Sequence, residues 1–355
     1  MDIIKCFISL IRLGIGHVVS EQPTQFDWES IYALASKQGL AAVIIDGLER
    51  LPESVRPPKE RLLEWIGEVL QGYDHRYELY RRTIAEMAYF YNKYGFKMMV
   101  LKGYACCLDW PKPEHRPCGD IDIWLFGEQK KADALLFTEK NLQVDDSHHH
   151  HTVFYWRDFM VENHYDFINV HHHKSNAEFE KILKEFGQND SYSTEIYEEK
   201  VYLPSPNLHA LFLQRHAVIE FAATGINLRQ LLDWGFFVNA HSNEIDWEWI
   251  MNVLDRFGMT RIFNIFNAIC VEDLGFEPSL FPAIQYFPYL KDKVLLDIIS
   301  PQFSSHMPKG LIKRVTYKFR RWRASGWKHQ LCYNESMMSA FWSGVKSHLL
   351  KPSSI

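Results

Sequence analysis

Two aspartates separated by one residue, Asp120 and Asp122, have the side chains and the spacing of two ligands that share one metal ion. They lie in the segment GDIDIWL, residues 119–125, where acids and apolar residues alternate. A β-strand places alternate residues on one face, so both carboxylates are predicted to point the same way. Like charges at such a distance repel each other, and a shared Mg²⁺ ion would relieve the repulsion. The alternative is a strand end with two solvated acids.

A second candidate site precedes this strand. Lys102 and Gly103 end the apolar run of residues 98–101. Glycine allows an anion to approach the backbone, the start of the next helix offers free N–H groups, and lysine adds charge. The pair therefore predicts a phosphate-binding turn, with a solvated strand end as the alternative. For Arg116 the alternatives are a phosphate contact, a pair with Asp120, or another structural salt bridge.

Together these residues resemble the DNA polymerase β-type nucleotidyltransferase superfamily, in which a Gly-containing turn and a helix precede a strand with an Asp-x-Asp metal site. More narrowly, LKG at 101–103, Arg116 and GDID at 119–122 resemble a bacterial family of uncharacterised nucleotidyltransferases. LRQLLDW at 228–234 extends the resemblance. It implies an α+β fold: a small mixed β-sheet nucleotidyltransferase core flanked by N-terminal and C-terminal helical regions.

The same resemblance implies a metal-dependent enzyme that transfers a nucleoside monophosphate from an NTP to an acceptor hydroxyl. Asp120 and Asp122 would be catalytic and would bind Mg²⁺ or Mn²⁺. The predicted nucleotide-binding residues are Lys102, Gly103, Arg116, Gly119, Asn169 and His171. The acceptor, whether a small molecule, a protein or a nucleic acid, is not identified by the sequence.

A third acid is expected on a neighbouring strand, where the matching stretch is residues 167–171 and Asn169 stands in place of the acid. In the family a histidine follows that position by two residues, which His171 satisfies. Asparagine can bind a metal through its oxygen but cannot act as a base, which leaves Asp122 for that role. The alternative function is therefore a catalytically weakened nucleotide-binding module of the same fold.

Histidine clusters at 148–151 and 171–173 suggest zinc. Neutral imidazoles bind Zn²⁺ well, but successive residues of a strand alternate faces, so four in a row cannot converge on one ion. The sequence assigns no role to the cluster at 148–151.

The helices and strands that must position these residues are predicted from the periodicity of apolar residues and from glycine and proline, which interrupt regular structure. We predict three regions: an N-terminal helical region at 1–95, an α/β core at 96–190 and a C-terminal helical domain at 191–355. The predicted elements are a first helix at 1–16, a long helix at 59–94 that stops at Gly95, strands at 97–101, 120–125, 152–156 and 165–171, a helix at 128–142, and helices from 191 onward.

Composition narrows the function classes. The net charge of −5 excludes a global positive field that recruits nucleic acid. Six cysteines without C-x-x-C spacing indicate reduced thiols and a cytoplasmic protein. No apolar run is long enough for a transmembrane segment. The basic amphipathic stretch at 309–328 either meets an anionic partner or packs on one side with the other side solvated.

Overall fold

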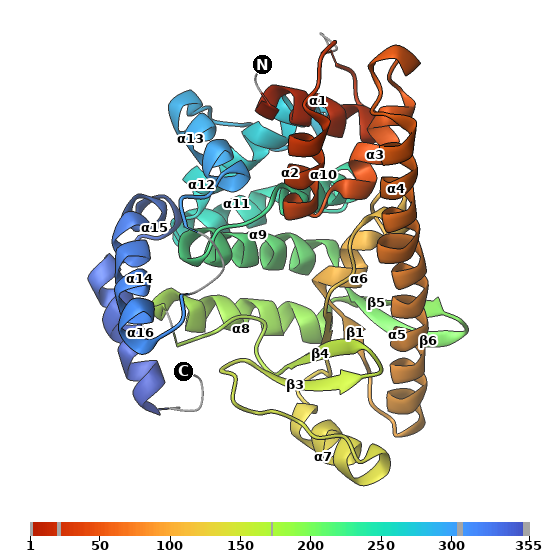
Figure 1. Ribbon diagram of the computed structural model, residues 1–355. Coiled ribbons are helices and arrows are strands. Elements are labelled where there is room, and N and C mark those ends of the chain that lie inside the picture. Colours follow the sequence, from red (N-terminus) through yellow and green to blue (C-terminus); the bar gives the residue numbers. More distant parts are fainter. Residues whose placement is uncertain (1–2, 20–22, 172, 304–307, 351–355) are drawn as a thin grey trace.

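The computed structural model describes residues 3–19, 23–171, 173–303 and 308–350. Helices surround one six-stranded sheet with the strand order β3-β4-β2-β1-β6-β5 (Figure 1). The strands are β1 (Met99–Val100), β2 (Ile121–Trp124), β3 (His151–Trp156), β4 (Phe159–His164), β5 (Ser191–Ile196) and β6 (Glu199–Pro204). Strand pairs β2–β4 and β1–β6 are parallel, and the other three pairs are antiparallel. The predicted α+β fold with a mixed sheet is confirmed.

The chain begins with helices. They are α1 (Ile3–Gly14), α2 (Trp28–Gln38), α3 (Ala41–Glu49), η1 (Glu53–Val55), α4 (Lys59–Val69), η2 (Leu70–His75) and α5 (Arg76–Lys93). The predicted long helix at 59–94 is confirmed, because α4, the π-helical turn η2 and α5 follow one another without a break. Gly95 ends it with φ +80°, a conformation that glycine adopts without a steric penalty.

Helices cover both faces of the sheet. One apolar core joins α5 and α7 (Gln129–Lys140) to residues such as Ile121 and Ile123 of β2. The other joins Trp124 to α8 (Lys174–Asn189) and α9 (Pro206–Ala223). The short elements α6 (Lys102–Cys107) and η3 (Pro113–His115) lie between β1 and β2 in the chain.

The remaining helices follow the sheet in sequence. They are α10 (Leu228–His241), α11 (Trp247–Arg256), α12 (Thr260–Ala268), η4 (Ile269–Asp273), η5 (Pro278–Leu280), α13 (Pro288–Ile299), α14 (Leu311–Ala324), α15 (Gly326–Cys332) and α16 (Met337–Leu350). Within the described residues, no helix has the length and apolarity needed to cross a bilayer.

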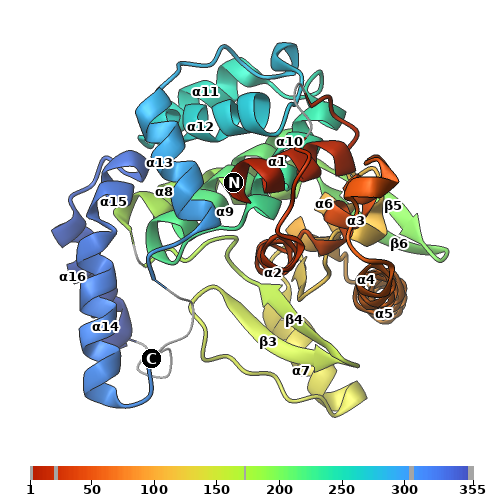
Figure 2. The same ribbon diagram turned by 45° about the horizontal axis from the view of Figure 1, so that its top comes forward.

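N-terminal and C-terminal helices lie against each other (Figure 2). The buried side chain of Gln38 at the end of α2 bridges them: its Nε2 donates to the carbonyl of Ile298 at 3.0 Å, and its Oε1 accepts from the N–H of Leu228 at 2.7 Å. Both helical regions thus share one core with the sheet. The division of the chain at 95 and 190 remains a prediction.

Two predicted elements are wrong. Residues 165–171 form turns, not a strand, because β3 and β4 already pair as a hairpin one segment earlier. The Glu180 carboxylate of α8 accepts the N–H groups of Phe167 (2.9 Å) and Ile168 (3.1 Å), so a side chain satisfies backbone groups that a strand partner would otherwise use.

The second error lies at 191–204, where we predicted helix and the structure has the β5–β6 hairpin. Tyr197 and Glu198 at its turn both have positive φ, which is the conformation that joins two strands tightly. In β6 the buried Val201 and Leu203 alternate with more exposed residues, a period-two pattern that our reading of the sequence missed.

Candidate functional site

Asp122 lies within β2, and Asp120 directly precedes that strand. Ile121 and Ile123 enter the core under α5, while Trp124 enters the opposite core, so the predicted strand alternation is confirmed. Asp120 and Asp122 both line a cavity of about 530 Å³, together with Lys102 and Gly103. The two acids and the lysine-glycine pair therefore border the same space.

Asp122 is the most buried acid of the site, with 1% of its side chain exposed. Its Oδ1 is 3.0 Å from Nζ of Lys102 and 3.0 Å from Nε2 of His164. Its Oδ2 is also buried and has no hydrogen-bond partner among the described residues. Such an unmatched buried acceptor costs about 1–3 kcal/mol, so the carboxylate has a free position for a cation.

The charged groups around Asp122 shift one another's pKa values. Burial opposes ionisation of Asp122, but Lys102 and His164 outweigh it and lower its pKa. Burial likewise opposes the charge of His164, while its hydrogen bonds to Asp122 and Glu162 raise its pKa to about 9. The pKa of Asp120 is raised, first by the negative charge of Asp122 and then by burial. Asp120 is thus the acid that gains most from an additional cation.

Glu162 is a third acid that the sequence analysis missed. It pairs with Asp122 in the parallel β2–β4 register, which puts both side chains on one face of the sheet. Its Oε2 is 3.5 Å from Nε2 of His164, and its side chain is 17% exposed. Burial opposes ionisation of Glu162, but the hydrogen bond from His164 lowers its pKa. Ligand atoms of Asp122, Glu162 and His164 all lie within 4.8 Å of one another.

Asn169 and His171 lie outside any strand, whereas the sequence analysis expected them on a strand at 165–171. Asn169 lies in the turns after β4, where its Oδ1 accepts the N–H of His171 at 2.9 Å. Like Glu162 and His164, neither is among the described residues that line the cavity, but unlike them neither contacts Asp122. The acid-x-His pattern expected there is instead met seven residues earlier by Glu162 and His164, and this pattern was the signal that could have found the third acid.

Gly103 lies in the first turn of α6, and its lack of a side chain has a packing reason. A Cβ atom there would approach the Tyr80 hydroxyl to 2.6 Å. That hydroxyl donates a hydrogen bond of 2.8 Å to the carbonyl of Asp120. Gly103 therefore leaves room for the tyrosine that holds the backbone of the first acid. At Gly119 no atom lies within 4 Å of the corresponding Cβ position.

Arg116 forms a structural salt bridge, but with Asp233 of α10 and not with Asp120. Its Nε and Nη2 donate to the two carboxylate oxygens at 2.8 and 2.9 Å, and both side chains are buried. Trp110 Nε1 donates to the same carboxylate at 2.9 Å. Arg229 and Asp233 are four residues apart on α10, a spacing that favours a pair along one helix turn, but Asp233 has Arg116 as its ion-pair partner instead.

Two cavity-lining cations remain available. Neither Lys37, at the end of α2, nor Arg229, in the first turn of α10, forms an ion pair within the part of the chain that the structure describes. Lys102 differs because it contacts Asp122 and lies 3.0 Å from Nε2 of His216. Burial opposes its charge, but the carboxylates of Asp122 and Glu162 raise its pKa.

Part of the histidine cluster borders the acids. His150, His151 and His164 place one ring nitrogen each within 4.8 Å of one another. Both ring nitrogens of His151 and Nδ1 of His150 are buried without a hydrogen-bond partner among the described residues. Burial lowers the pKa of His151 to about 4, so its ring is neutral at pH 7. Burial lowers the pKa of His150 as well, so His150 and His151 are neutral beside Glu162, whereas His164 is charged.

Comparison with known proteins places the chain in a family. A crystal structure of an antigenic nucleotidyltransferase-like protein from Paracoccidioides brasiliensis is similar, with 13% identity, 56% of this chain and 92% of that chain covered, and a TM-score of 0.35. Among curated proteins no match is found. Residues 24–275 match the family described as uncharacterised nucleotidyltransferase. The matched range includes Asp120, Asp122 and Glu162. The chain therefore belongs to the family of uncharacterised nucleotidyltransferases.

Proposed function

We propose that the protein transfers a nucleoside monophosphate from a nucleoside triphosphate to an acceptor hydroxyl, with Mg²⁺ or Mn²⁺ as cofactor. One observation carries the proposal: Asp122 pairs with Glu162 across β2 and β4, beside Asp120, and one buried oxygen of Asp122 is unpartnered. Three carboxylates are the hard oxygen donors that Mg²⁺ prefers. The residues fit such an ion, which would neutralise charge on the transferred phosphoryl group.

The free cations of the cavity suit the phosphates. Lys37 and Arg229 would bind phosphate oxygens, since the described residues offer them no ion-pair partner. Lys102 would hold Asp122 in place and add positive charge beside the ion. Arg116 would act as a brace through Asp233, which we prefer to the phosphate contact expected from the sequence. Gly103 and Gly119 would form the cavity wall next to the acids.

In the proposed reaction the acceptor oxygen attacks the α-phosphorus, a new P–O bond forms, and the bond to pyrophosphate breaks. The acceptor proton passes to a carboxylate. We assign this role to Glu162, because its side chain is more exposed than that of Asp122 and His164 keeps it ionised. Glu162 supplies a third acid, which supports transfer over the alternative from the sequence, a weakened nucleotide-binding module with Asn169 in place of the acid.

The test combines binding and turnover in the full chain. We expect Mn²⁺-dependent binding of α,β-methylene nucleoside triphosphates by calorimetry, and pyrophosphate release from ordinary NTPs with a panel of hydroxyl acceptors. Asp120→Asn should abolish both, whereas Lys130→Gln, an exposed change on α7, should abolish neither. Absence of Mn²⁺-dependent binding in the unmodified protein would overturn the proposal. Binding without turnover across the panel would favour the nucleotide-binding module.

A further inference from the structure

A basic C-terminal segment contrasts with the acidic remainder of the chain. Residues 298–355 contain ten Lys or Arg and one acid, Glu335, whereas residues 1–297 contain 29 Lys or Arg and 43 acids. This segment also lies outside residues 24–275, which match the nucleotidyltransferase family. Its charge therefore needs an explanation separate from the proposed transfer reaction.

Two helices, α14 and α16, carry seven of the ten basic residues of this segment, and we call them the C-terminal helix pair. One ring contact joins the two helices: Trp322 of α14 lies 5.6 Å from Phe341 of α16. A second contact joins α14 to the segment before it, where Tyr317 lies 5.6 Å from Phe303. The pair lies at the edge of the molecule, on the side opposite α4 and α5 (Figures 1 and 2). It is thus free to meet a large surface.

The cations of α14 have no acidic partner among the residues that the structure describes. Within the described residues they form no ion pair, in contrast to Lys328 of α15, which is buried against Asp297. All but the half-buried Arg321 are exposed. These cations are Lys313, Arg314, Lys318, Arg320, Arg321 and Arg323.

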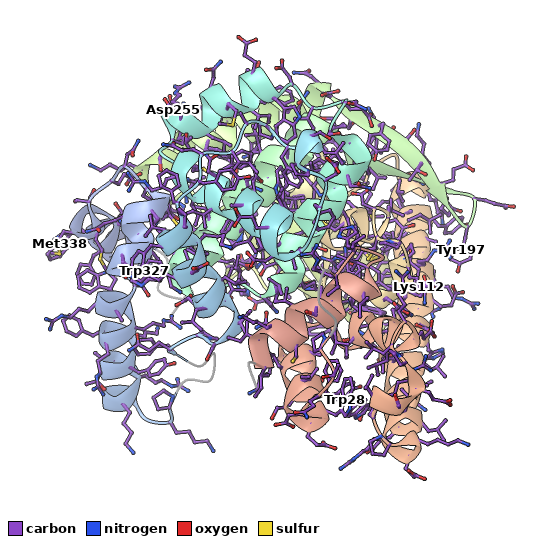
Figure 3. The ribbon with its side chains drawn as sticks, turned by 90° about the horizontal axis from the view of Figure 1, so that it is seen from above. Trp28, Lys112, Tyr197, Asp255, Trp327 and Met338 are labelled. Carbon is purple, nitrogen blue, oxygen red and sulfur yellow. The ribbon has the colours of Figure 1, made fainter. Side chains whose placement is uncertain are left out.

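Large apolar side chains are exposed among these cations. Val315 and Phe319 of α14 are each 57% exposed, and with Trp322 they have the i, i+4, i+7 spacing of one helix side. Met338, Phe341 and Trp342 continue the apolar surface on α16 with 42–62% exposure. Met338 lies at the outer edge of the molecule (Figure 3). Exposed apolar patches of this kind mark interaction surfaces.

We propose that the C-terminal helix pair binds the surface of a membrane that contains anionic lipids. Only such a surface presents negative headgroups directly beside hydrocarbon, which matches cations that flank an apolar strip. Single-stranded nucleic acid would use the cations and aromatic rings, but Val315 and Met338 offer it no ring for base stacking. A second copy of the pair would bring like charges together.

The experiment is flotation of the full chain with vesicles. The chain should float with vesicles of 70% phosphatidylcholine and 30% phosphatidylglycerol, should stay behind with pure phosphatidylcholine, and should be released by 0.5 M NaCl. Arg320→Glu with Arg323→Glu should weaken binding at least about 30-fold, since each basic residue near such a surface contributes about a factor of five. Phe319→Ser with Trp342→Ser should weaken it at least about 10-fold.

Matched controls are Lys130→Glu on α7 and Tyr155→Ser on β3, both exposed and outside the pair; neither should change flotation. Circular dichroism checks that each variant is folded. Failure of the unmodified chain to float with anionic vesicles overturns the proposal, as does binding that ignores the charge variants. Capture of a 30-nucleotide single strand without flotation would assign the surface to nucleic acid instead. None of these outcomes depends on nucleotide transfer.

Discussion

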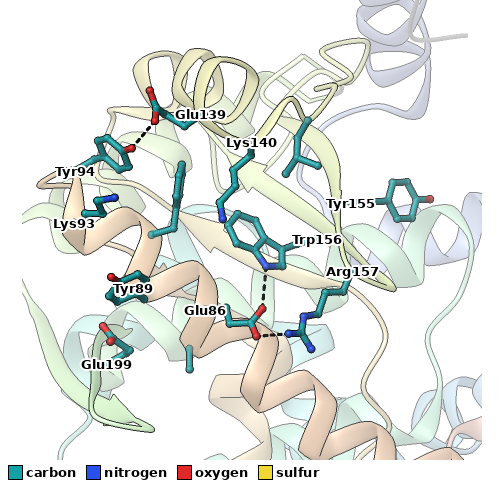
Figure 4. Close-up of a pocket in the computed structure, with 13 residues that line it drawn as sticks. Glu86, Tyr89, Lys93, Tyr94, Glu139, Lys140, Tyr155, Trp156, Arg157 and Glu199 are labelled. Carbon is teal, nitrogen blue, oxygen red and sulfur yellow. Dashed lines mark hydrogen bonds and ion pairs between the residues drawn. The ribbon is translucent and has the colours of Figure 1, made fainter.

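Two hollows of similar size lie on different parts of the molecule and differ in how their charges are matched. A groove of about 660 Å³ between α5, α7 and the β3–β4 turn is larger than the acid-lined cavity of about 530 Å³ (Figure 4). In the groove Glu86 accepts hydrogen bonds from Trp156 Nε1 and from Arg157. Lys140 Nζ lies 5.1 Å from the centre of the Trp156 ring. The polar groups of the groove therefore largely satisfy one another.

The cavity lacks this balance. One oxygen of Asp122 is buried without a partner among the described residues, and neither Lys37 nor Arg229 forms an ion pair there. A buried polar group without a partner lowers the stability of a folded protein, and such groups persist where a ligand supplies the missing partner. The comparison teaches that unmatched polar groups, and not volume, distinguish the cavity that we propose as the functional site.

The largest expected effect is on turnover. Asp122→Asn should lower the rate of pyrophosphate release by about three orders of magnitude or more, because it removes a proposed metal ligand and leaves Lys102 and His164 without their carboxylate. Glu86→Gln removes an acid from the larger groove and should leave the rate unchanged. Equal losses in the two variants, each shown to be folded by its melting curve, would break the comparison.

The second effect concerns stability. Asp233→Asn should lower the free energy of unfolding by about 3–5 kcal/mol, because it leaves the buried Arg116 guanidinium without its charge partner. Arg157→Gln in the groove breaks an exposed pair with Glu86 and should cost at most about 1 kcal/mol. Urea denaturation measures both. A cost for Asp233→Asn no larger than that for Arg157→Gln would show that Arg116 is not a brace.

A smaller effect is expected at the glycines of the cavity. Gly103→Ala should cost about 1–3 kcal/mol, because its Cβ would displace the Tyr80 hydroxyl from the Asp120 carbonyl. Gly119→Ala, with open space at that position, should change stability by less than about 0.5 kcal/mol. Thermal unfolding of both variants checks the difference. Equal costs would mean that Tyr80 does not fix the first acid.

A further prediction concerns the pH dependence of stability in EDTA. The pKa of His164 is raised to about 9 in the folded chain, above its ordinary value of 6.5, by Asp122 and Glu162 against the effect of burial. Its contribution is fully present below pH 6.5 and is lost as the pH rises through 9. The unfolding free energy should therefore fall between pH 6.5 and 9. In His164→Gln this slope should flatten; an unchanged slope would contradict the assignment.

Sequence reasoning predicted the elements that local periodicity determines. The long helix at 59–94, its stop at Gly95 and the alternation around Asp122 all follow from spacing within one segment. The register of neighbouring strands does not follow from such spacing. Glu162 was missed because the dipeptide Arg157-Asp158, between two apolar runs, was not interpreted as a hairpin turn, and the next strand was therefore placed too late.

Contacts between residues far apart in the sequence could not be predicted from local sequence patterns. Arg116 and Asp233 are 117 residues apart, and the spacing within α10 favoured Arg229 as the partner of Asp233. The packing of Tyr80 against Gly103 likewise depends on how α5 crosses the sheet. Such pairings are decided by tertiary packing, so the sequence identified the candidate residues more reliably than their partners.

The walls of the acid-lined cavity come from Phe266 and from residues within 36–39, 102–122 and 213–234. A nucleotide bound in this cavity would therefore contact residues 36–39 and residues 213–234 at once, although these segments are almost two hundred positions apart in the sequence. Protease cleavage between α1 and α4 should slow when a nucleotide is bound in the cavity. The cleavage rate would then report nucleotide binding before any acceptor is identified.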